Sequence, residues 1–484
     1  MMFRWLARNH QARKRLQALN RRRPWQRSAP KDAQHPLGLV GMLGDGESKL
    51  LFELARTCFS GRGTVVDAGS FLGKSASLLA AGLRANRISS AVSKKIHCFD
   101  SFQIYERHTV EFIQQQLGHQ VAIGDSTRIF FDRQVEPVRD LLQVHAGDFL
   151  QTHWSAGPIE LLLVDIAKSE QLWSHVLSEL FPSLIPGVSI IIHQDYHHAW
   201  LPHIHVVMEF LHPFFELVIP RVDGSAVFLM KAPIPPAMLE KAIRNEFSLE
   251  ERVALMDAAI NRIPTTERFL VRCAKVVLLN SKEQRLDAML TNIEQLEQIC
   301  AAEGSNDDLP VMRQCLADMQ ATFLENVGWN ALRSENWVLA LDTAKHLRAA
   351  QGNDELDGNQ VLMFGCSLIG LGRFQEAEEW LRRSPVAISS GSPYIAIELA
   401  RSVLYQGRHD EAEHILLKNL EHTCPGEADH TVLSRHIDVL LEVFASRGNP
   451  AQDRDTASRV SVLIPGNALL ERLSDARGME RRPA

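Results

Sequence analysis

The sequence predicts an α/β domain built on a mostly parallel sheet, followed by an all-α domain of helical repeats. Short apolar runs recur between residues 64 and 230, and several of them end at an acidic residue. Helix-like stretches alternate with these runs, which is typical of parallel strands joined by helices. Beyond Met238 no strand-like alternation follows, and a short motif instead recurs after 35 residues. That period indicates stacked helical units.

The strand–turn–helix at residues 64–83 is the strongest local signal. Thr64 to Val66 is a β-branched strand, and residues 75–83 have the Ala/Leu content of a helix. A strand that enters a helix through a glycine turn gathers free backbone N–H groups at the positive helix end. The turn therefore predicts a nucleotide-type pocket at the carboxyl edge of the sheet. Its candidate cofactor-binding residues are Asp67, Gly69, Ser70 and Gly73.

Glycine spacing separates the ligand classes that use such a turn. A dinucleotide fold needs G-x-G-x-x-G, whereas this chain has Gly69-x-x-x-Gly73, which disfavours an NAD-dependent enzyme. A P-loop needs one more residue before Gly73-Lys74-Ser75. The remaining pattern, Asp-x-Gly-x-x-x-Gly, resembles the first motif of class I S-adenosylmethionine-dependent methyltransferases. The resemblance implies a Rossmann-like, seven-stranded fold with S-adenosyl-L-methionine as cofactor.

Acidic residues stand at the ends of the later strands as well. The expected strands 95–99, 142–146, 160–164 and 188–192 are followed by Asp100, Asp148, Asp165 and Asp195. An acid at the tip of the second strand can accept both ribose hydroxyls of an adenosine. We therefore add Asp100 and Asp148 to the cofactor-binding candidates. The runs 214–219 and 226–230 predict a closing antiparallel hairpin.

A closer resemblance covers about residues 45–231, and its specific part lies near residues 158–196. The segments 157–169, 181–187 and 194–196 are similar to the macrocin O-methyltransferase type, which methylates sugar hydroxyls with the help of a divalent cation. The resemblance implies a sugar or glycosylated small molecule as acceptor. The chain departs from the family's Asp-x-Asp at Asp165-Ile166-Ala167, and from its Asp-Asp-Tyr at Gln194-Asp195-Tyr196.

The residues after the fourth and fifth strands suit activation of a hydroxyl. An alcohol is a poor nucleophile unless a base removes its proton or a cation lowers its pKa. Two carboxylates and an amide oxygen are hard ligands suited to Mg²⁺, so we expect Asp165, Gln194 and Asp195 to hold a magnesium ion. Asp165 or His193 is the expected catalytic base. The alternative is that Gln194 marks the loss of metal use.

Beyond the sheet, the sequence predicts four segments. Residues 1–36 form a basic tail, residues 37–231 the methyltransferase-like domain, residues 232–320 a linker with connecting helices, and residues 321–484 the repeats. Residues 1–31 hold ten Lys or Arg and no acid. Such a tail is either solvated or an arm that binds an anionic partner.

The repeats give the second half of the chain a separate expected role. Residues 372–381 are echoed at 407–416, with a fainter copy at 336–341. The pattern resembles tetratricopeptide repeats, which implies a protein partner. The alternative function is therefore a degenerate methyltransferase fold that acts as a binding scaffold.

The amino-acid composition indicates the cellular compartment. No apolar run approaches the length of a membrane span. The seven cysteines are scattered and never in C-x-x-C spacing, which argues against a disulfide framework and for a reducing compartment. We expect a cytoplasmic protein.

Overall fold

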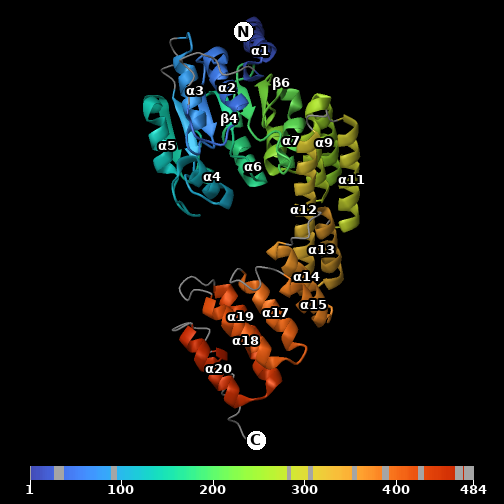
Figure 1. Cartoon of the computed structure of the whole chain (residues 1–484). Helices are drawn as coiled ribbons and strands as arrows, with labels where there is room; N and C mark the ends of the chain where they lie inside the picture. The colour runs from blue at the N-terminus through green and yellow to red at the C-terminus, as the bar shows by residue number, and fades with distance from the viewer. Residues whose placement is uncertain are drawn as a thin grey trace. The chain divides into compact units, whose positions relative to one another are not determined.

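The chain forms two compact units, Met1–Lys282 and Glu283–Ala484. A computed structural model (Figure 1) describes residues 2–26, 38–88, 95–280, 285–303, 309–351, 357–383, 392–422, 430–463 and 472–473.

The first unit is organised around a seven-stranded sheet in the order β3-β2-β1-β4-β5-β7-β6. Strands β1 to β5 pair in parallel, and β7 is antiparallel to both of its neighbours. The strands are β1 Thr64–Ala68, β2 Ile96–Asp100, β3 Leu142–Ala146, β4 Ile159–Val164, β5 Ile190–His193, β6 Phe215–Val222 and β7 Ser225–Met230. The predicted α/β class, with a closing hairpin and a helical region after it, is confirmed.

Helices cover both faces of this sheet. Side chains of α2 (Asp45–Glu53), α3 (Lys74–Arg84) and α5 (Arg128–Val135) share one buried core with Val65 and Ile192. Those of α6 (Glu170–Glu179) and α7 (Pro202–Phe210) share the opposite core with Val66 and Ile191. Neighbouring strand residues face opposite sides. This alternation later decides which strand-end side chains reach the cavity.

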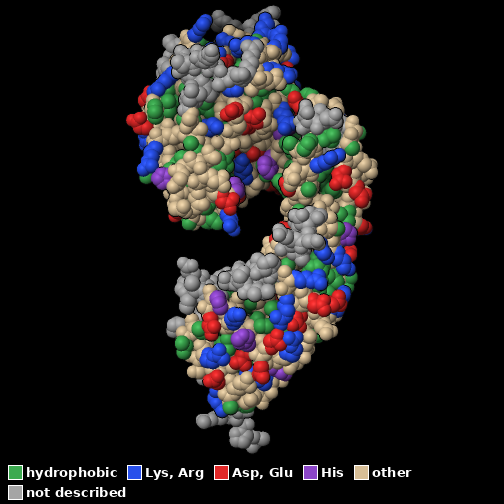
Figure 2. Space-filling model, in the orientation of Figure 1, with side chains coloured by type: hydrophobic (Ala, Val, Ile, Leu, Met, Phe, Trp, Pro, Cys, Tyr) green, Lys and Arg blue, Asp and Glu red, His purple; other side chains and the backbone are tan. Residues whose placement is uncertain are grey.

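The basic N-terminal segment differs from the expected tail. Helix α1 runs from Met2 to Arg22, and its Leu16 and Leu19 are buried in the sheet core. Asn20 Nδ2 donates to the Val218 carbonyl at 2.8 Å, and Arg13 pairs with Glu216 of β6. A solvated tail therefore does not describe residues 2–26, whereas residues 27–36 of the predicted tail lie outside the described residues. Lys and Arg side chains gather where α1 lies (Figure 2), and an anionic partner there stays a prediction.

Three helices expected as connectors belong to the first unit. They are α8 (Pro236–Arg244), α9 (Leu249–Arg262) and α10 (Phe269–Asn280). Helix α8 packs on α6, and α9 and α10 pack on α7. The Arg262 guanidinium pairs with the nearly buried Glu209 of α7 at 2.7 Å. The apolar faces of these helices complete the second core of the sheet.

The second unit consists, in its described part, of consecutive helices that pack on their neighbours. They are α11 Leu286–Glu303, α12 Leu309–Arg333, α13 Trp337–Gln351, α14 Gly358–Gly370, α15 Phe374–Arg382, α17 Pro393–Leu404, α18 His409–His422, α19 His430–Arg447 and α20 Pro450–Leu463. Gly372 and Gly407 adopt positive φ at equivalent turns, and Ala377 and Ala412 are buried at equivalent contacts. The tetratricopeptide assignment itself stays a prediction. Across the described residues, no helix combines the length and apolarity needed to cross a membrane.

The boundary of the sheet unit yields a test by truncation. A chain that ends at Lys282 keeps α8–α10 and should unfold cooperatively. A chain that ends at Lys231 exposes the apolar side chains that those helices cover, and its melting temperature should fall by at least about 2–4 °C, the shift that about 1 kcal/mol causes in a domain of roughly 150–250 residues. Equal melting temperatures would show that the helices are dispensable.

Buried histidines make the sheet unit sensitive to acid. Burial lowers the pKa of His205 to about 3 and that of His197 to about 4. An unfolded histidine titrates near pH 6.5, so the unfolded chain binds more protons below that pH. The stabilisation is thus fully present above about pH 6.5 and is lost as pH falls toward the folded pKa.

Replacing one buried histidine should flatten this dependence. In urea titrations, His205→Phe should reduce the slope of the unfolding free energy by about 1.4 kcal/mol per pH unit between pH 6 and 4. His414→Phe, at an exposed position of α18, is the control and should leave the slope unchanged. An unaltered slope for His205→Phe would contradict the assignment.

Candidate functional site

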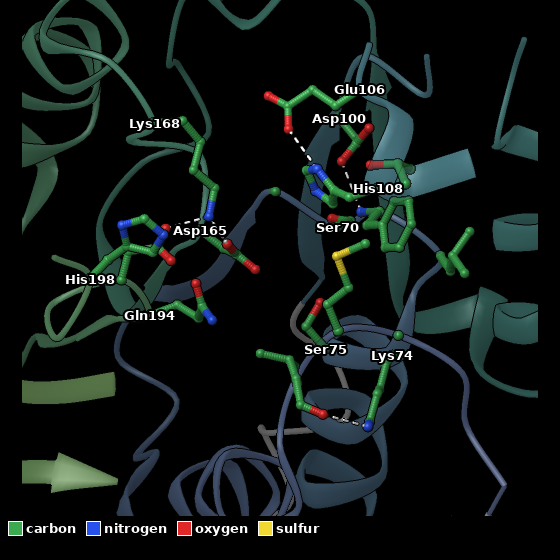
Figure 3. A pocket seen from close by; sticks show the side chains of 18 of the residues that line it. Ser70, Lys74, Ser75, Asp100, Glu106, His108, Asp165, Lys168, Gln194 and His198 are labelled. Atoms are coloured by element: carbon green, nitrogen blue, oxygen red, sulfur yellow. Dashed lines mark hydrogen bonds and ion pairs between the residues drawn. The ribbon is translucent and has the colours of Figure 1, made fainter. Parts of the chain in front are cut away.

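A cavity of about 530 Å³ opens at the carboxyl ends of the parallel strands (Figure 3). Asp165, Lys168, Gln194 and His198 lie on one side of it, whereas Asp100, Glu106 and His108 lie on the other. Met42, Leu43, Phe71, Leu72 and Leu201 contribute apolar surface. Such a mixture, on this scale, is typical of a small-molecule site.

Asp100 is held in place at the tip of β2. Its two carboxylate oxygens accept the backbone N–H groups of Phe71 (2.8 Å) and Phe102 (2.7 Å). Burial raises the pKa of Asp100, and these two hydrogen bonds oppose the shift. The carboxylate lines the cavity beside Ser70, and its role as a ribose acceptor stays a prediction.

The two motif glycines are required by protein packing. At Gly69 (φ +106°) a Cβ would lie 2.6 Å from the Asp165 carbonyl oxygen. At Gly73 (φ +88°) it would lie 2.5 Å from Cγ1 of Val135 in α5. The N–H groups of Gly69 and Ser70 donate to the Phe99 carbonyl. The spacing therefore reports close packing of the turn on β4 and α5, although Gly69 also lines the cavity.

Besides Gly73, three predicted site residues lie outside the cavity lining. Asp67 is fully buried beneath the turn, where it accepts the Ser75 hydroxyl at 2.8 Å, and burial raises its pKa to about 6. Asp148 caps a short 3-10 helix through the Leu150 N–H. His193 is fully buried with its ring against Trp173, and burial lowers its pKa well below the usual value. Asp67 and Asp148 thus form hydrogen bonds within the protein and do not face the cavity.

Lys74 and Ser75, which imitate the end of a P-loop, have structural partners. The Ser75 hydroxyl donates to the Asp67 carboxylate, and the Lys74 ammonium donates to the Leu43 carbonyl at 2.7 Å. Gln134 exchanges two hydrogen bonds with the Val40 backbone. These contacts fasten the segment 40–43 along the cavity, so Lys74 helps to build a wall of the site.

Asp165 and Asp195 come together because β4 and β5 pair in parallel, with Val164 beside His193. Lys168 Nζ donates to Asp165 Oδ1 at 2.8 Å and to Asp195 Oδ2 in a very short contact. Burial raises the pKa of Asp165 to about 7 against the opposing effect of Lys168. Burial alone would lower the pKa of Lys168, but the two carboxylates outweigh it and the pKa is raised.

Gln194 adds a second donor to the same carboxylates. The orientation of its amide is assigned from its neighbours: with the nitrogen toward the carboxylates it donates to Asp195 Oδ1 at 2.6 Å and to Asp165 Oδ1 at 2.9 Å, whereas the oxygen in that position would face only acceptors. A magnesium ion requires oxygen ligands aimed at a common point, but here an ammonium and an amide nitrogen face both carboxylates. The three predicted ligands meet, yet in this arrangement they do not fit Mg²⁺. The described residues also contain no group of three His, Cys, Asp or Glu side chains arranged for a metal.

Four polar residues of the cavity are not among the predicted site residues: Lys168, His198, Glu106 and His108. Lys168 was visible as a cation three residues after Asp165. His198 was visible only as one of several clustered histidines, and its Nδ1 accepts the Trp200 N–H at 3.2 Å. Glu106 and His108 pair at 3.0 Å at the start of α4 (Arg107–Leu117), and no strand-end signal marked them.

The packing role of Gly69 can be tested against a second glycine. Gly69→Ala combines left-handed backbone strain, about 1–3 kcal/mol, with a collision against Asp165. Gly118→Ala is the matched control, because φ is +67° there but nothing lies within 4 Å. In urea titrations Gly69→Ala should cost at least about 1 kcal/mol more than Gly118→Ala. Equal losses would show that the contact with β4 is unimportant.

Comparison with known proteins bears on the same region. A search of curated proteins returned no match. Among solved structures, the crystal structure of PilW, a widely conserved type IV pilus biogenesis factor, is similar to 49% of this chain and 94% of PilW, with 16% identity and a TM-score of 0.28. The family model of a methyltransferase domain matches residues 66–195. This match runs from Val66 in β1 to Asp195 after β5, and it supports a class I methyltransferase domain over these residues. S-adenosylmethionine is the usual cofactor of such domains.

Proposed function

We propose that the first unit transfers a methyl group from S-adenosylmethionine to a hydroxyl of a sugar or glycosylated small molecule. The observation that carries the proposal is one cavity with Asp100 on one side and Asp165 on the other. Asp100 can accept hydrogen bonds from the ribose hydroxyls of the cofactor. Asp165 can accept the proton that the acceptor alcohol must lose. The methyltransferase domain match supports the cofactor class.

The side chains that line the cavity fit this cofactor. The fixed carboxylate of Asp100 is placed for ribose hydroxyls. Ser70, Met42 and Leu72 line the same space and supply polar and apolar contacts. When bound, the cofactor supplies a methyl group activated by its sulfonium. The protein then has to orient the acceptor and remove its proton.

Asp165 is the best-placed proton acceptor. Its Oδ1 accepts from Lys168 and Gln194, but Oδ2 accepts no hydrogen bond from the described residues. Oδ2 is therefore the atom that would receive the proton of the acceptor hydroxyl. His193 lies outside the cavity. His198, which accepts on Nδ1, carries its proton on Nε2 when neutral, and so it presents a donor.

The side of the cavity where the acceptor would react is polar. Lys168, Gln194 and His198 line it beside Asp165. Side chains that both donate and accept hydrogen bonds match the hydroxyl groups of a sugar. This feature favours a polyhydroxylated acceptor.

The helical repeats support a second candidate function, a scaffold built on an inactive methyltransferase fold. Paired helices α14/α15 and α17/α18 repeat equivalent glycine turns and buried alanines. Tetratricopeptide-like units would then recruit a protein partner. Cofactor binding and methyl transfer separate the two candidates.

The proposed cofactor can be tested by thermal shift and calorimetry. S-adenosylhomocysteine should raise the melting temperature of the full chain, whereas NAD and ATP should not. Asp100→Asn should weaken its binding at least about tenfold, because a charged acceptor for two hydroxyls is lost. Asp148→Asn is the control and should bind normally, since Asp148 caps a short helix outside the cavity.

Two results would contradict this assignment. Stabilisation by NAD but not by S-adenosylhomocysteine would overturn the cofactor class. Binding of S-adenosylhomocysteine without methyl transfer to any of a panel of glycosylated acceptors would favour the scaffold.

A further inference from the structure

The ammonium of Lys168 lies between the carboxylates expected to hold a metal. Its side chain comes from the loop after β4 and is 52% exposed, whereas those of Asp165 and Asp195 are only 22% and 9% exposed. Two carboxylates this close and this buried repel each other unless a cation lies between them. Lys168 meets that requirement from within the chain.

With the Gln194 amide assigned as above, every described polar contact to these carboxylates is made by a hydrogen-bond donor. Lys168 and Gln194 both donate to Asp165 Oδ1, and they donate to Oδ2 and Oδ1 of Asp195, respectively. A metal ligated by the same oxygens would break the Lys168 contacts and turn the Gln194 amide around. The donor pattern is therefore the opposite of the one that a metal needs.

We propose that Lys168 is the resident cation of this site, taking the place of a divalent metal ion and positioning the acceptor hydroxyl. This inference rests on the proposed function, because such a role has meaning only if a hydroxyl reacts in the cavity. It makes Lys168 a specificity-determining residue for metal-independent transfer.

The geometry leaves Lys168 one donor for the acceptor. An ammonium has three N–H groups, and the described contacts use two of them, for Asp165 and Asp195. Lys168 lines the cavity next to Asp165. The third N–H can therefore hold the acceptor oxygen while Asp165 Oδ2 takes its proton, and the ammonium stabilises the negative charge that develops on that oxygen.

The charges also oppose a metal beside the lysine. Two carboxylates and one ammonium leave a net charge of −1, whereas a site without Lys168 would offer −2. Within about 4 Å, a dication and an ammonium would repel each other by several kcal/mol at the effective dielectric constant of a protein surface. Metal affinity should therefore appear only when the ammonium is removed.

The test is direct binding of Mn²⁺, followed by the loss of the electron paramagnetic resonance signal of the free ion, with S-adenosylhomocysteine present. Wild-type protein should not differ from Asp165→Asn. The double variant Lys168→Met with Gln194→Asp should bind Mn²⁺ at least about tenfold more tightly than wild type. Lys74→Met is the matched control, because it removes another cavity lysine that donates to Leu43, and it should gain no binding.

Two results would overturn the inference: wild-type binding of Mn²⁺ that Asp165→Asn abolishes, or a folded double variant that gains no affinity. If the double variant does not fold, Lys168→Gln with its neutral amide replaces it, and the comparison of wild type with Asp165→Asn decides independently. Lys168→Gln should still bind S-adenosylhomocysteine, since Asp100 lies across the cavity. Failure of S-adenosylhomocysteine to bind any form defeats the proposed function, whereas the Mn²⁺ result remains readable without it.

Discussion

The site depends on the electrostatic balance at the ends of β4 and β5. Parallel pairing places Val164 beside His193, so the next residues on each strand bring Asp165 and Asp195 together. An unpaired charge in such a place costs several kcal/mol. Lys168 supplies the opposite charge from the adjoining loop, and Gln194 fills the remaining space with a neutral donor. The carboxylates can thus stay close together without an external ion.

The turn that contains Gly69 packs closely against Asp165. Gly69 lies so close to the Asp165 backbone that a side chain would strike its carbonyl, and Asp165 N donates to the Ala68 carbonyl. On the other side of the turn, the Phe71 N–H holds Asp100. A single short loop therefore contacts both Asp100, the proposed ribose acceptor, and Asp165, the proposed base. For a displacement that proceeds mainly through positioning, this rigidity has direct chemical value.

The sequence predicted the sheet well, because β-branched runs with acids at their ends are a local signal. It predicted the side-chain directions less well. His193 continues the alternation of β5 on the face of Ile191, and so it turns into the core shared with Trp173. Asp67 ends in the same way beneath the turn. Both directions follow from the two-residue period of a strand, which the identity of the residues alone does not reveal.

Other features depended on contacts between distant parts of the chain. Leu16 and Leu19 of α1 are spaced for one helix face, but the many surrounding arginines made the segment resemble a solvated tail. The wall at 40–43 is held by Gln134, about ninety residues away. No local pattern encodes such a contact.

An ammonium and a magnesium ion are not equivalent partners for a hydroxyl. A metal binds the oxygen directly and lowers its pKa strongly, whereas an ammonium offers one charged hydrogen bond. A site that relies on Lys168 must therefore depend more on its base. Asp165 suits that demand, because burial favours its protonated form while Oδ2 stays open to the cavity. The same burial that makes a lysine necessary here thus also makes the neighbouring carboxylate a better proton acceptor.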